Sequence, residues 1–198
     1  PNPSDMGIDL ADKLAQKNLV VATECEKEYT SKSYDVEKKD IVLSQQQKKV
    51  FEEITSQDNS KPHLIHGVTS SGKTSVFIKL IQHTLDKGKS AMLLVPEISL
   101  TPQMINLLTG YFGDIVSVLH SKLSQSERLH QHRLIQQGKS KVIIGTRSAV
   151  FAPVANIGII IIDEEHEKAF KSENSPSYSA IRVATFKKKK KNAKLVLA

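Results

Sequence analysis

The sequence predicts an α/β fold in which helices cover both faces of a parallel sheet, and two observations favour it. From residue 41 onward, apolar runs of four to six residues alternate with amphipathic segments of helical periodicity. That alternation is typical of βαβ units. In addition, Ile159–Ile162 is an unbroken run of four isoleucines, and a strand without a polar face must be covered on both sides.

The expected elements alternate along the chain from residue 41. The short apolar runs predict strands at His63–His66, Ala91–Val95, Ile115–Leu119, Lys141–Gly145 and Ile157–Ile162. The amphipathic segments before and between them have apolar side chains at helical spacing, and they predict helices at Ser44–Thr55, Gly72–Asp86, Leu100–Phe112 and Gln125–Gln137. Residues 41–198 are therefore expected to form one domain.

Residues 1–40 are the most polar part of the chain and have a different organisation. Apolar residues at helical spacing between Ile8 and Leu14 predict one helix, and Leu19–Thr23 predicts a short strand. Glu24–Lys39 is charged and is either a second strand or an exposed linker. One helix and one or two strands cannot enclose a core. We therefore expect this segment to be the end of a domain that begins upstream.

Composition narrows the class of protein. Hydrophobic residues make up 39% and charged residues 25% of the chain, which excludes global disorder. No apolar run approaches the roughly 18–20 residues that span a bilayer, and the first residues lack the basic segment of a signal peptide. The single cysteine, Cys25, excludes a disulfide framework and favours a reducing, cytoplasmic setting. The net charge of +7 is weak evidence for nucleic acid, since Lys187–Lys191 alone supplies five positive charges.

The strongest motif is Gly67–Thr74, which matches the phosphate-binding pattern G-x-x-x-x-G-K-S/T between a predicted strand and a predicted helix. Its glycines let backbone N–H groups face phosphate oxygens, and the helix that follows adds its dipole. We expect Lys73 to reach the β- and γ-phosphates of ATP and Thr74 to bind Mg²⁺. A glycine-rich turn that matches by chance is the alternative. The expected ATP-binding segment comprises Gly67, Val68, Thr69, Ser70, Ser71, Gly72, Lys73 and Thr74.

A second charged motif, Asp163-Glu164-Glu165-His166, follows the isoleucine strand. Open α/β sheets bind their ligands at the carboxyl ends of the strands. We expect Asp163 to hold Mg²⁺ through water, and Glu164 to be the general base that polarises an attacking water. The alternatives are an acidic helix N-terminus stabilised by the helix dipole and, for His166, an ordinary surface histidine.

The phosphate loop and the acidic box together resemble those of DExH-box superfamily 2 helicases. Other segments resemble the primosomal replication-restart helicases of the PriA family. Val95–Gln103 resembles motif Ia of that family, and Leu119–Arg128 resembles the stretch after it. Ile144–Pro153 resembles motif Ib, and Lys171–Tyr178 resembles the loop after the acidic box. The resemblance covers roughly residue 41 to the end, and residues 1–40 resemble more weakly the end of that family's winged-helix domain.

The resemblance implies a RecA-like ATP-binding lobe that stops before the family's zinc-binding module and second lobe. It implies an ATP-dependent 3′-to-5′ DNA helicase that uses ATP and Mg²⁺ and acts on single-stranded and forked DNA in replication restart and primosome assembly. It also implies single-stranded DNA-binding protein and primosome proteins as partners, no membrane, and a bacterial cytoplasmic, nucleoid-associated location. The arginine finger belongs to the second lobe, so this lobe alone is not expected to unwind DNA.

The resemblance also implies roles for individual side chains. Gln47 would read adenine, although a solvated helix glutamine fits the sequence as well. The single-strand path would include Glu97, Thr101, Gln103, Thr146, Arg147, Phe170 and Tyr178. Hydroxyl and guanidinium groups suit phosphate oxygens without reading bases. Thr101 also suits a helix cap before Pro102, and Phe170 and Tyr178 suit base stacking and hydrophobic packing equally.

Three departures from the family pattern stand out. Ser70 replaces a usual glycine of the loop, Ile181-Arg182 replaces an Arg-Asp pair, and Lys187–Lys191 replaces a mixed amphipathic segment. The lysine run is a solvated end, a sequence artefact or a DNA contact. Two other functions stay open at this point. One is a P-loop kinase or small-molecule ATPase, which would need an arginine-rich lid although the chain has only four arginines. The other is a non-catalytic fragment that binds DNA.

Overall fold

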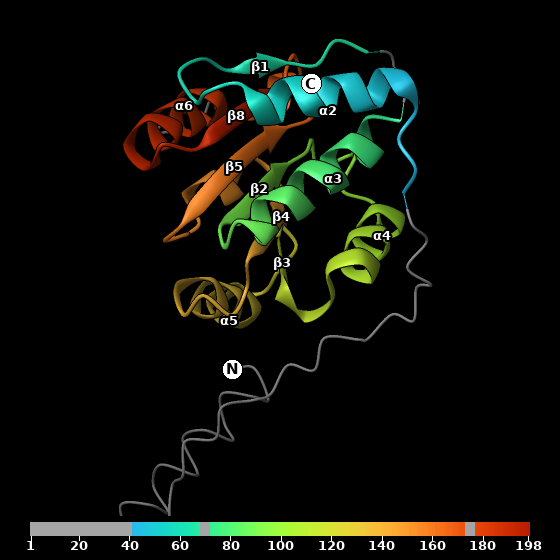
Figure 1. Ribbon diagram of the computed structural model, residues 1–198. Helices are drawn as coiled ribbons and strands as arrows, with labels where there is room; N and C mark the ends of the chain where they lie inside the picture. The colour runs from blue at the N-terminus through green and yellow to red at the C-terminus, as the bar shows by residue number, and fades with distance from the viewer. Residues whose placement is uncertain (1–40, 68–71, 173–176) are drawn as a thin grey trace, which may run out of the picture. The chain divides into compact units, whose positions relative to one another are not determined.

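The computed structural model describes residues 41–67, 72–172 and 177–198. The domain expected at residues 1–40 and the free positions 68–71 of the phosphate loop lie outside the described residues. Six strands, all parallel, form one sheet in the order β1-β8-β5-β2-β4-β3 (Figure 1). Their bounds are β1 His63–Leu64, β2 Ser90–Leu94, β3 Val116–Leu119, β4 Val142–Gly145, β5 Ile157–Ile162 and β8 Lys194–Leu197. The predicted parallel α/β fold is confirmed.

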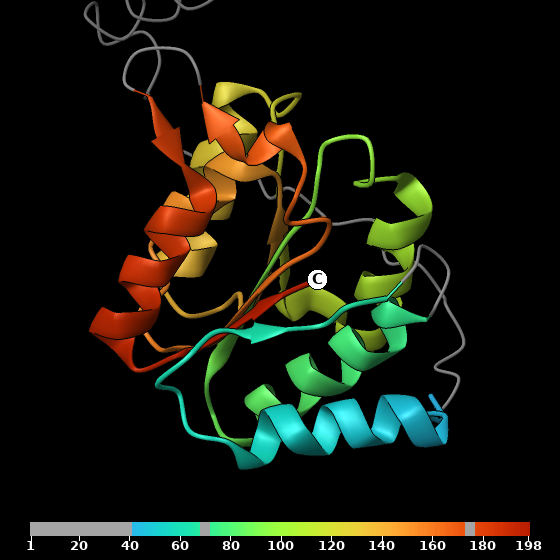
Figure 2. The same cartoon turned by 90° about the horizontal axis from the view of Figure 1, so that it is seen from above.

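Helices cover both faces of this sheet (Figures 1 and 2). One face carries α2 (Gln45–Ser56), α3 (Lys73–Asp86) and α4 (Pro102–Phe112), and the other carries α5 (Gln125–Gln136) and α6 (Ala180–Lys191). Three short 3₁₀ helices lie between the longer elements, at Gly113–Ile115 (η1), Arg147–Phe151 (η2) and Lys168–Phe170 (η3). A small antiparallel hairpin of β6 (Lys171–Ser172) and β7 (Tyr178–Ser179) forms a separate sheet. No helix within the described ranges has the length and apolar character needed to cross a membrane.

Side-chain caps fix where several helices begin. At the start of α2, the hydroxyl of Ser44 accepts the Gln47 N–H while the Gln47 side chain accepts the Ser44 N–H, at 3.3 and 2.9 Å. Such a reciprocal pair satisfies two N–H groups that the helix itself leaves unpaired. The predicted cap of α4 is also present, because the Thr101 hydroxyl accepts the Met104 N–H at 3.3 Å with Pro102 at the first helical position.

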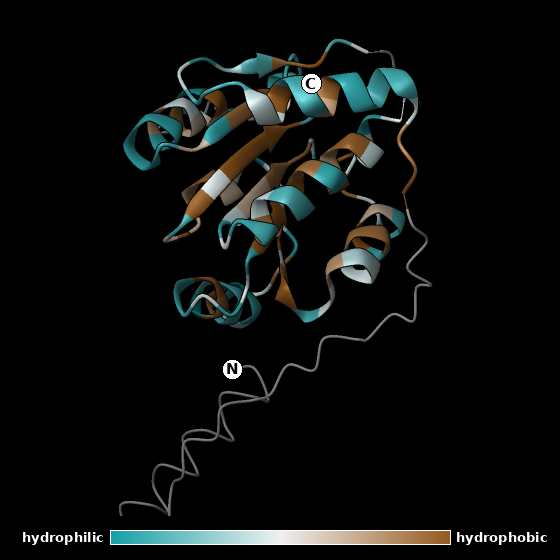
Figure 3. Cartoon of the chain, in the orientation of Figure 1, coloured by the Kyte–Doolittle hydropathy of each residue, from teal (hydrophilic) through white to brown (hydrophobic). Residues whose placement is uncertain are grey.

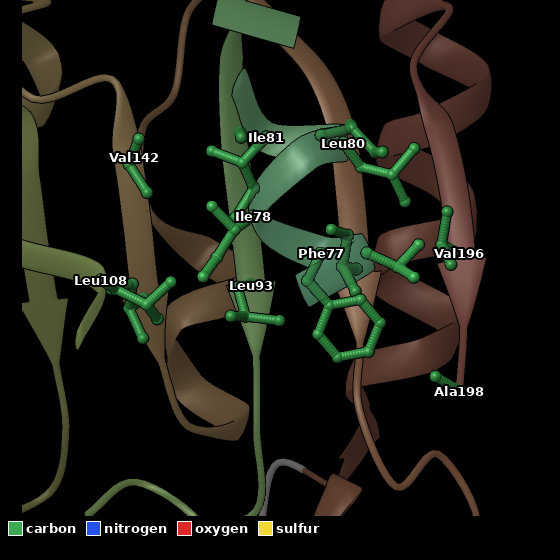
Figure 4. Close-up of a cluster of buried hydrophobic side chains, with 14 of the residues drawn as sticks. Phe77, Ile78, Leu80, Ile81, Leu93, Leu108, Val142, Val196 and Ala198 are labelled. Atoms are coloured by element: carbon green, nitrogen blue, oxygen red, sulfur yellow. The ribbon is translucent and has the colours of Figure 1, made fainter. Parts of the chain in front are cut away.

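Burial of strand β5 on both faces explains its unbroken isoleucine run. Along β5, Ile159 and Ile161 face the layer of α2, α3 and α4, whereas Ile160 and Ile162 face the layer of α5 and α6, and all four are at most 1% exposed. Figure 3 shows the apolar strands between more polar helices. Figure 4 shows how Phe77 of α3 packs with Leu93 of β2 and other aliphatic side chains. Each such side chain contributes about 1.5–3 kcal/mol when buried.

The last helix and strand, α6 and β8, were not predicted. The buried stripe of α6 is Ala180, Ala184 and Lys188, so a lysine stands where periodicity requires an apolar residue. The interpretation of the lysine run as a solvated end is wrong for two of its members. The ammonium group of Lys188, a residue only 3% exposed, donates to the Ser60 carbonyl at 2.6 Å, and that of Lys187 donates to the Ala152 carbonyl at 2.8 Å. Burial, and secondarily the charge of Lys191, lowers the pKa of Lys187.

Lys188 and Lys190 provide a test of this arrangement, because they are the same residue type in one helix and only the first is buried. Lys188→Ala removes the aliphatic packing and leaves the Ser60 carbonyl without its donor. We expect it to lower the free energy of unfolding by about 1–3 kcal/mol. Lys190→Ala is expected to change it by less than about 0.5 kcal/mol. Urea unfolding of both variants measures the difference, and equal losses would contradict the burial of Lys188.

Candidate functional site

The acidic box lies at the carboxyl edge of the sheet and is tied to the strands on both sides of β5. The N–H of Asp163 donates to the carbonyl of Leu94 in β2, and the N–H of Glu165 donates to the carbonyl of Ala198 after β8, both at 2.9 Å. Gly67, the first residue of the phosphate loop, follows β1 at the same edge and is exposed. Because all strands run in one direction, the two predicted nucleotide motifs end up on the same side of the sheet.

Lys73 joins these two motifs. Its Nζ lies 3.1 Å from Glu164 Oε1 and 3.3 Å from Asp163 Oδ1. The side chains of Lys73, Asp163 and Glu164 are 11%, 15% and 24% exposed. Partly buried charges are screened less than surface charges, so the three groups interact strongly. The lysine of the phosphate loop and both predicted carboxylates thus form one charged cluster.

Burial and charge act in opposite directions on this cluster. Burial would lower the pKa of Lys73, but the hydrogen bond to Glu164 and the charge of Asp163 outweigh it, so the pKa is raised above 10.5. For Asp163 the largest influence is burial, which raises the carboxyl pKa above 3.8 although Lys73 opposes the shift. Asp163 is therefore a carboxylate in surroundings that disfavour its charge, which is common where function rather than stability selects a residue.

Glu164 adopts a backbone conformation that is unusual for its residue type. Its φ of +51° lies in the left-handed region, which costs a residue with a Cβ about 1–3 kcal/mol. Two hydrogen bonds hold the turn, one from the Glu164 N–H to Asp163 Oδ1 at 3.1 Å and one from the Glu167 N–H to the Glu164 carbonyl at 2.9 Å. His166 is 68% exposed, with Nε2 3.6 Å from Glu164 Oε2. The turn lets the Glu164 carboxylate interact with Lys73 and His166.

Gln47 contacts the phosphate loop. While its Oε1 completes the cap of α2, its Nε2 donates to the carbonyl of Gly72 at 3.3 Å. Gly72 has φ +77°, and a Cβ at this position would collide with the Gln47 amide nitrogen. The backbone conformation therefore favours glycine here, whereas the flexible Gln47 side chain could move aside for a Cβ. The contact favours the nucleotide-side interpretation of Gln47 over that of a solvated glutamine.

The residues of the cluster suit a magnesium ion whose shell is completed by a nucleotide. Thr74, on the first turn of α3, offers a hydroxyl, and Asp163 offers a carboxylate. Mg²⁺ prefers oxygen ligands and usually binds one or two carboxylates together with phosphate oxygens. Within residues 41–67, 72–172 and 177–198, no group of three or more His, Cys, Asp and Glu side chains could hold a metal alone. The donor set thus fits Mg²⁺ with ATP.

A cavity of about 290 Å³ opens at the carboxyl ends of β2 and β4. Its lining includes four residues of the predicted single-strand path, Glu97, Thr146, Arg147 and Phe170. It also includes Ser121, which was not predicted and whose hydroxyl donates to the Glu97 carboxylate. Thr101 and Gln103 are exposed at the start of α4. A serine in a loop carries no sequence signal of its own, so only the fold relates Ser121 to Glu97.

Arg147 holds the hairpin that follows the acidic box. Its guanidinium donates to the carbonyls of Ala169 and Lys171, at 3.3 and 2.5 Å. The same group lies over the Tyr178 ring, 5.7 Å from the ring centroid, within the range of a cation–π interaction. Arg147 follows β4, whereas Lys171 and Tyr178 belong to the hairpin, so one side chain connects two of the segments assigned to the single-strand path.

The two aromatic residues of the predicted path differ in position. Phe170 is 1% exposed and belongs to the core between the sheet and α6, which favours hydrophobic packing over base stacking for this residue. Tyr178 is half-buried and packs edge-to-face against Phe151, with ring centroids 4.8 Å apart. Phe151 is 52% exposed. Phe151, which was not predicted, therefore adds exposed aromatic surface beside the half-buried Tyr178.

Comparison with known proteins agrees with this geometry. The family model described as DEAD/DEAH box helicase matches residues 44–197. The chain is 48% identical to the replication restart protein PriA of Bacillus subtilis (strain 168) over 147 residues, which are 73% of this chain and 18% of that protein. It is 38% identical to the PriA of Synechocystis sp. over 186 residues, covering 93% of this chain and 22% of that protein. The chain thus spans about a fifth of the length of these curated relatives.

Solved structures support the fold. The chain matches RecG bound to a three-way DNA junction with a TM-score of 0.60 and 22% identity, over 96% of this chain and 22% of that one. It matches the UvsW helicase from bacteriophage T4 with a TM-score of 0.57 and 19% identity, over 81% of this chain and 53% of that one. At these identities the likeness concerns the fold alone, which is that of RecA-like helicase lobes.

The raised pKa of Asp163 predicts that this carboxylate destabilises the fold near neutral pH. Its ionised form is disfavoured above the folded-state pKa, and this cost disappears as the pH falls through that pKa toward 3.8. Asp163→Asn should therefore raise the free energy of unfolding at pH 7 by roughly 0.5–2 kcal/mol. The gain should vanish in acid, where Asp163 is protonated. Exposed Asp114→Asn serves as the control, and a gain that persists unchanged at pH 3 would contradict the assignment.

Proposed function

Because the chain belongs to the DEAD/DEAH box helicase family and is similar to PriA over most of its length, we propose that it is the ATP-binding lobe of a DNA helicase that acts in replication restart. The observation that carries this proposal is the cluster of Lys73, Asp163 and Glu164, in which the lysine of the phosphate loop lies within 3.3 Å of both carboxylates. Such a cluster is suited to bind a phosphate chain and to hydrolyse it.

Each residue of the cluster has a role in this proposal. Against the effect of burial, Glu164 and Asp163 raise the pKa of Lys73 in the free protein. Lys73 then exchanges these carboxylate partners for the phosphate oxygens of ATP. Thr74 and Asp163 would hold Mg²⁺, which neutralises phosphate charge when bound. Glu164, once Lys73 has turned to the phosphates, accepts a proton from the attacking water. Gln47 lies on the nucleotide side through its contact with the loop at Gly72.

We assign the cavity at the ends of β2 and β4 to single-stranded DNA. Its polar side chains, Glu97, Thr146 and Arg147, together with Thr101 and Gln103 at the start of α4, suit sugar and phosphate contacts. Tyr178 and the exposed ring of Phe151 supply stacking surface. Arg147 has a second task in this proposal, since its bonds to the hairpin carbonyls link the DNA side to the segment that follows the acidic box.

The activities of a larger protein also belong to this proposal. The matched relatives are named for replication restart and are about five times as long as the matched region. We propose that the complete protein moves 3′-to-5′ on single-stranded and forked DNA in the bacterial cytoplasm, near the nucleoid, with single-stranded DNA-binding protein and primosome proteins as partners. We expect zinc to bind only in a module downstream of this lobe. An arginine finger from a second lobe is worth about 10³–10⁵ in rate, so this lobe alone binds ATP but does not unwind DNA.

Nucleotide binding by the chain tests the cluster. Lys73→Ala removes a charged hydrogen-bond donor from the phosphate site and should weaken MgATP binding about 10- to 100-fold. Glu164→Gln removes a competitor for Lys73 and should leave binding unchanged or make it tighter. Lys79→Ala, on the same helix, is the matched control. Calorimetry measures all three, and parent-like binding by Lys73→Ala would refute the assignment.

DNA binding tests the role of Arg147. Arg147→Ala should weaken the binding of single-stranded DNA equally for all sequences. It should also reduce the slope of log affinity against log salt concentration by about one unit, because one phosphate contact is lost. Arg147→Lys keeps the charge but not the fork that bridges two carbonyls, so it should retain the salt slope and lose affinity. The comparison variant replaces Lys189, Lys190 and Lys191 by Gln. If fluorescence anisotropy shows that this variant loses DNA binding while Arg147→Ala retains it, the DNA path runs over α6 instead.

A further inference from the structure

A second cavity lies at the opposite edge of the sheet, among residues to which the proposed helicase chemistry gives no role. Its volume is about 240 Å³, and its lining includes His83, Lys87, Lys89, Gly158 and Lys194. These residues come from the end of α3 and the starts of β2, β5 and β8. α3 has 14 residues and is therefore about 20 Å long. Lys73, which contacts Asp163 and Glu164, is the first residue of α3 at its other end, so this cavity is remote from the acidic box.

The charges of the cavity are unbalanced. Among the described residues that line it, three are lysines and none is an aspartate or glutamate. Asp58, which acts on Lys194, and Asp86, which acts on His83, are both engaged with other groups. Asp58 accepts hydrogen bonds from the N–H and hydroxyl of Ser60, and Asp86 accepts one from the Gln82 amide at 2.8 Å. Within the described part of the chain, Lys87 and Lys89 take part in no ion pair, and the ammonium group of Lys194 donates to the Gln57 carbonyl.

The dipole of α3 explains only one of these lysines. A cation is stabilised at a helix C-terminus, and Lys87 directly follows the last residue of α3. Lys89, however, precedes β2, and Lys194 opens β8. The positive charges of the three lysines line one cavity and therefore repel one another. Burial lowers the pKa of Lys194, and the charge of Lys87 lowers it further, whereas Asp58 opposes the shift.

His83 also lines this cavity, and its ring carries one buried polar atom that no described hydrogen bond uses. Its Nε2 is buried and has no hydrogen-bond partner within the part of the chain that the structure describes. The ring is held edge-to-face against Phe51, with centroids 5.6 Å apart. Burial lowers the pKa of His83, Lys87 and Lys194 act in the same direction, and Asp86 opposes them. A buried nitrogen without a partner is uncommon in folded proteins and calls for a specific cause.

Gly158 shapes the floor of the cavity. In the pairing of β2 with β5, Ser90 faces Ile157 and Ala91 faces Ile159, so the register shifts at Gly158. A Cβ at this position would lie 2.7 Å from the Thr84 methyl and 2.8 Å from Lys89 Cβ. A glycine within a strand often marks a bulge or a close approach by another group. Here it lets the stem of Lys89 lie directly against the sheet.

We propose that this cavity binds a phosphate group, at a site separate from the nucleotide loop. Lysines bind phosphate as point charges, whereas planar carboxylates are more often held by the arginine fork, and no arginine lines the cavity. Its volume is below the roughly 300 Å³ at which pockets for whole drug-sized ligands begin. The site therefore takes a free phosphate ion, a terminal phosphoryl group or a backbone phosphate of nucleic acid.

His83 reports directly on this site in solution. The Hε1 signal of His83 is assigned by its loss in His83→Gln, and its pH titration is recorded by proton NMR. The titration is repeated with inorganic phosphate and, separately, with a single-stranded oligonucleotide. Because an anion stabilises the imidazolium, bound phosphate should raise the pKa of His83 toward 6.5. The measurement is repeated in the Lys73→Ala chain, in which the nucleotide loop is impaired. The shift should persist there, so the result does not depend on the proposed helicase function.

Matched lysine variants decide the outcome. Lys87→Gln should raise the phosphate concentration at half-saturation about two- to fivefold, which is the effect expected from the loss of an exposed ion pair. Lys139→Gln, at an exposed residue outside the cavity, should leave this concentration unchanged. A response to the oligonucleotide at lower concentration than to phosphate would identify nucleic acid as the source, and a response to phosphate alone would identify a small phosphate. The proposal is overturned if neither probe moves the His83 signal, or if Lys139→Gln weakens binding as much as Lys87→Gln.

Discussion

All six strands of the main sheet run in the same direction, and this constraint determines where chemistry can take place. Polar residues that follow parallel strands collect at one edge, because the strands themselves are filled with apolar side chains and are covered on both faces. Gly67 follows β1, Thr146 follows β4 and Asp163 follows β5. The two candidate ligand surfaces at this edge are therefore neighbours by topology.

The charged cluster at that edge combines groups that stabilise and groups that strain the fold. Lys73 gains from its carboxylate partners, whereas burial works against the charge of Asp163. Glu164 adds backbone strain through its positive φ. The rest of the sheet provides the stability that tolerates this arrangement, since the isoleucines of β5 directly before the cluster are almost completely buried. The candidate site thus combines favourable ion pairs with a buried charge and a strained backbone.

Most of the fold and the central part of the site follow from local patterns, and the remainder depends on long-range contacts. The five expected strands and four expected helices appear within a few residues of their predicted bounds, because periodicity and apolar runs are local properties. α6 was missed because Lys188 occupies a buried position and conceals the helical stripe. The motif residues Lys73, Asp163 and Glu164 could be named from spacing alone. The conformation of Glu164, the bonds of Arg147 and the contact of Gln47 with Gly72 could not, since each depends on residues distant in sequence.

The position of β8 has a consequence for the order in which the chain can fold. β1, the strand that leads into the phosphate loop, pairs in the sheet with β8, so that His63 lies beside Val196 and Leu64 beside Leu197. Contacts between such distant segments form late, because closing a long loop costs entropy before the pairing returns any energy. During synthesis on the ribosome, β2, β3, β4 and β5 are available to pair well before β8 emerges. We therefore expect a stage of synthesis in which β2, β3, β4 and β5 can already pair while β1, which leads into the phosphate loop, still lacks its neighbour β8.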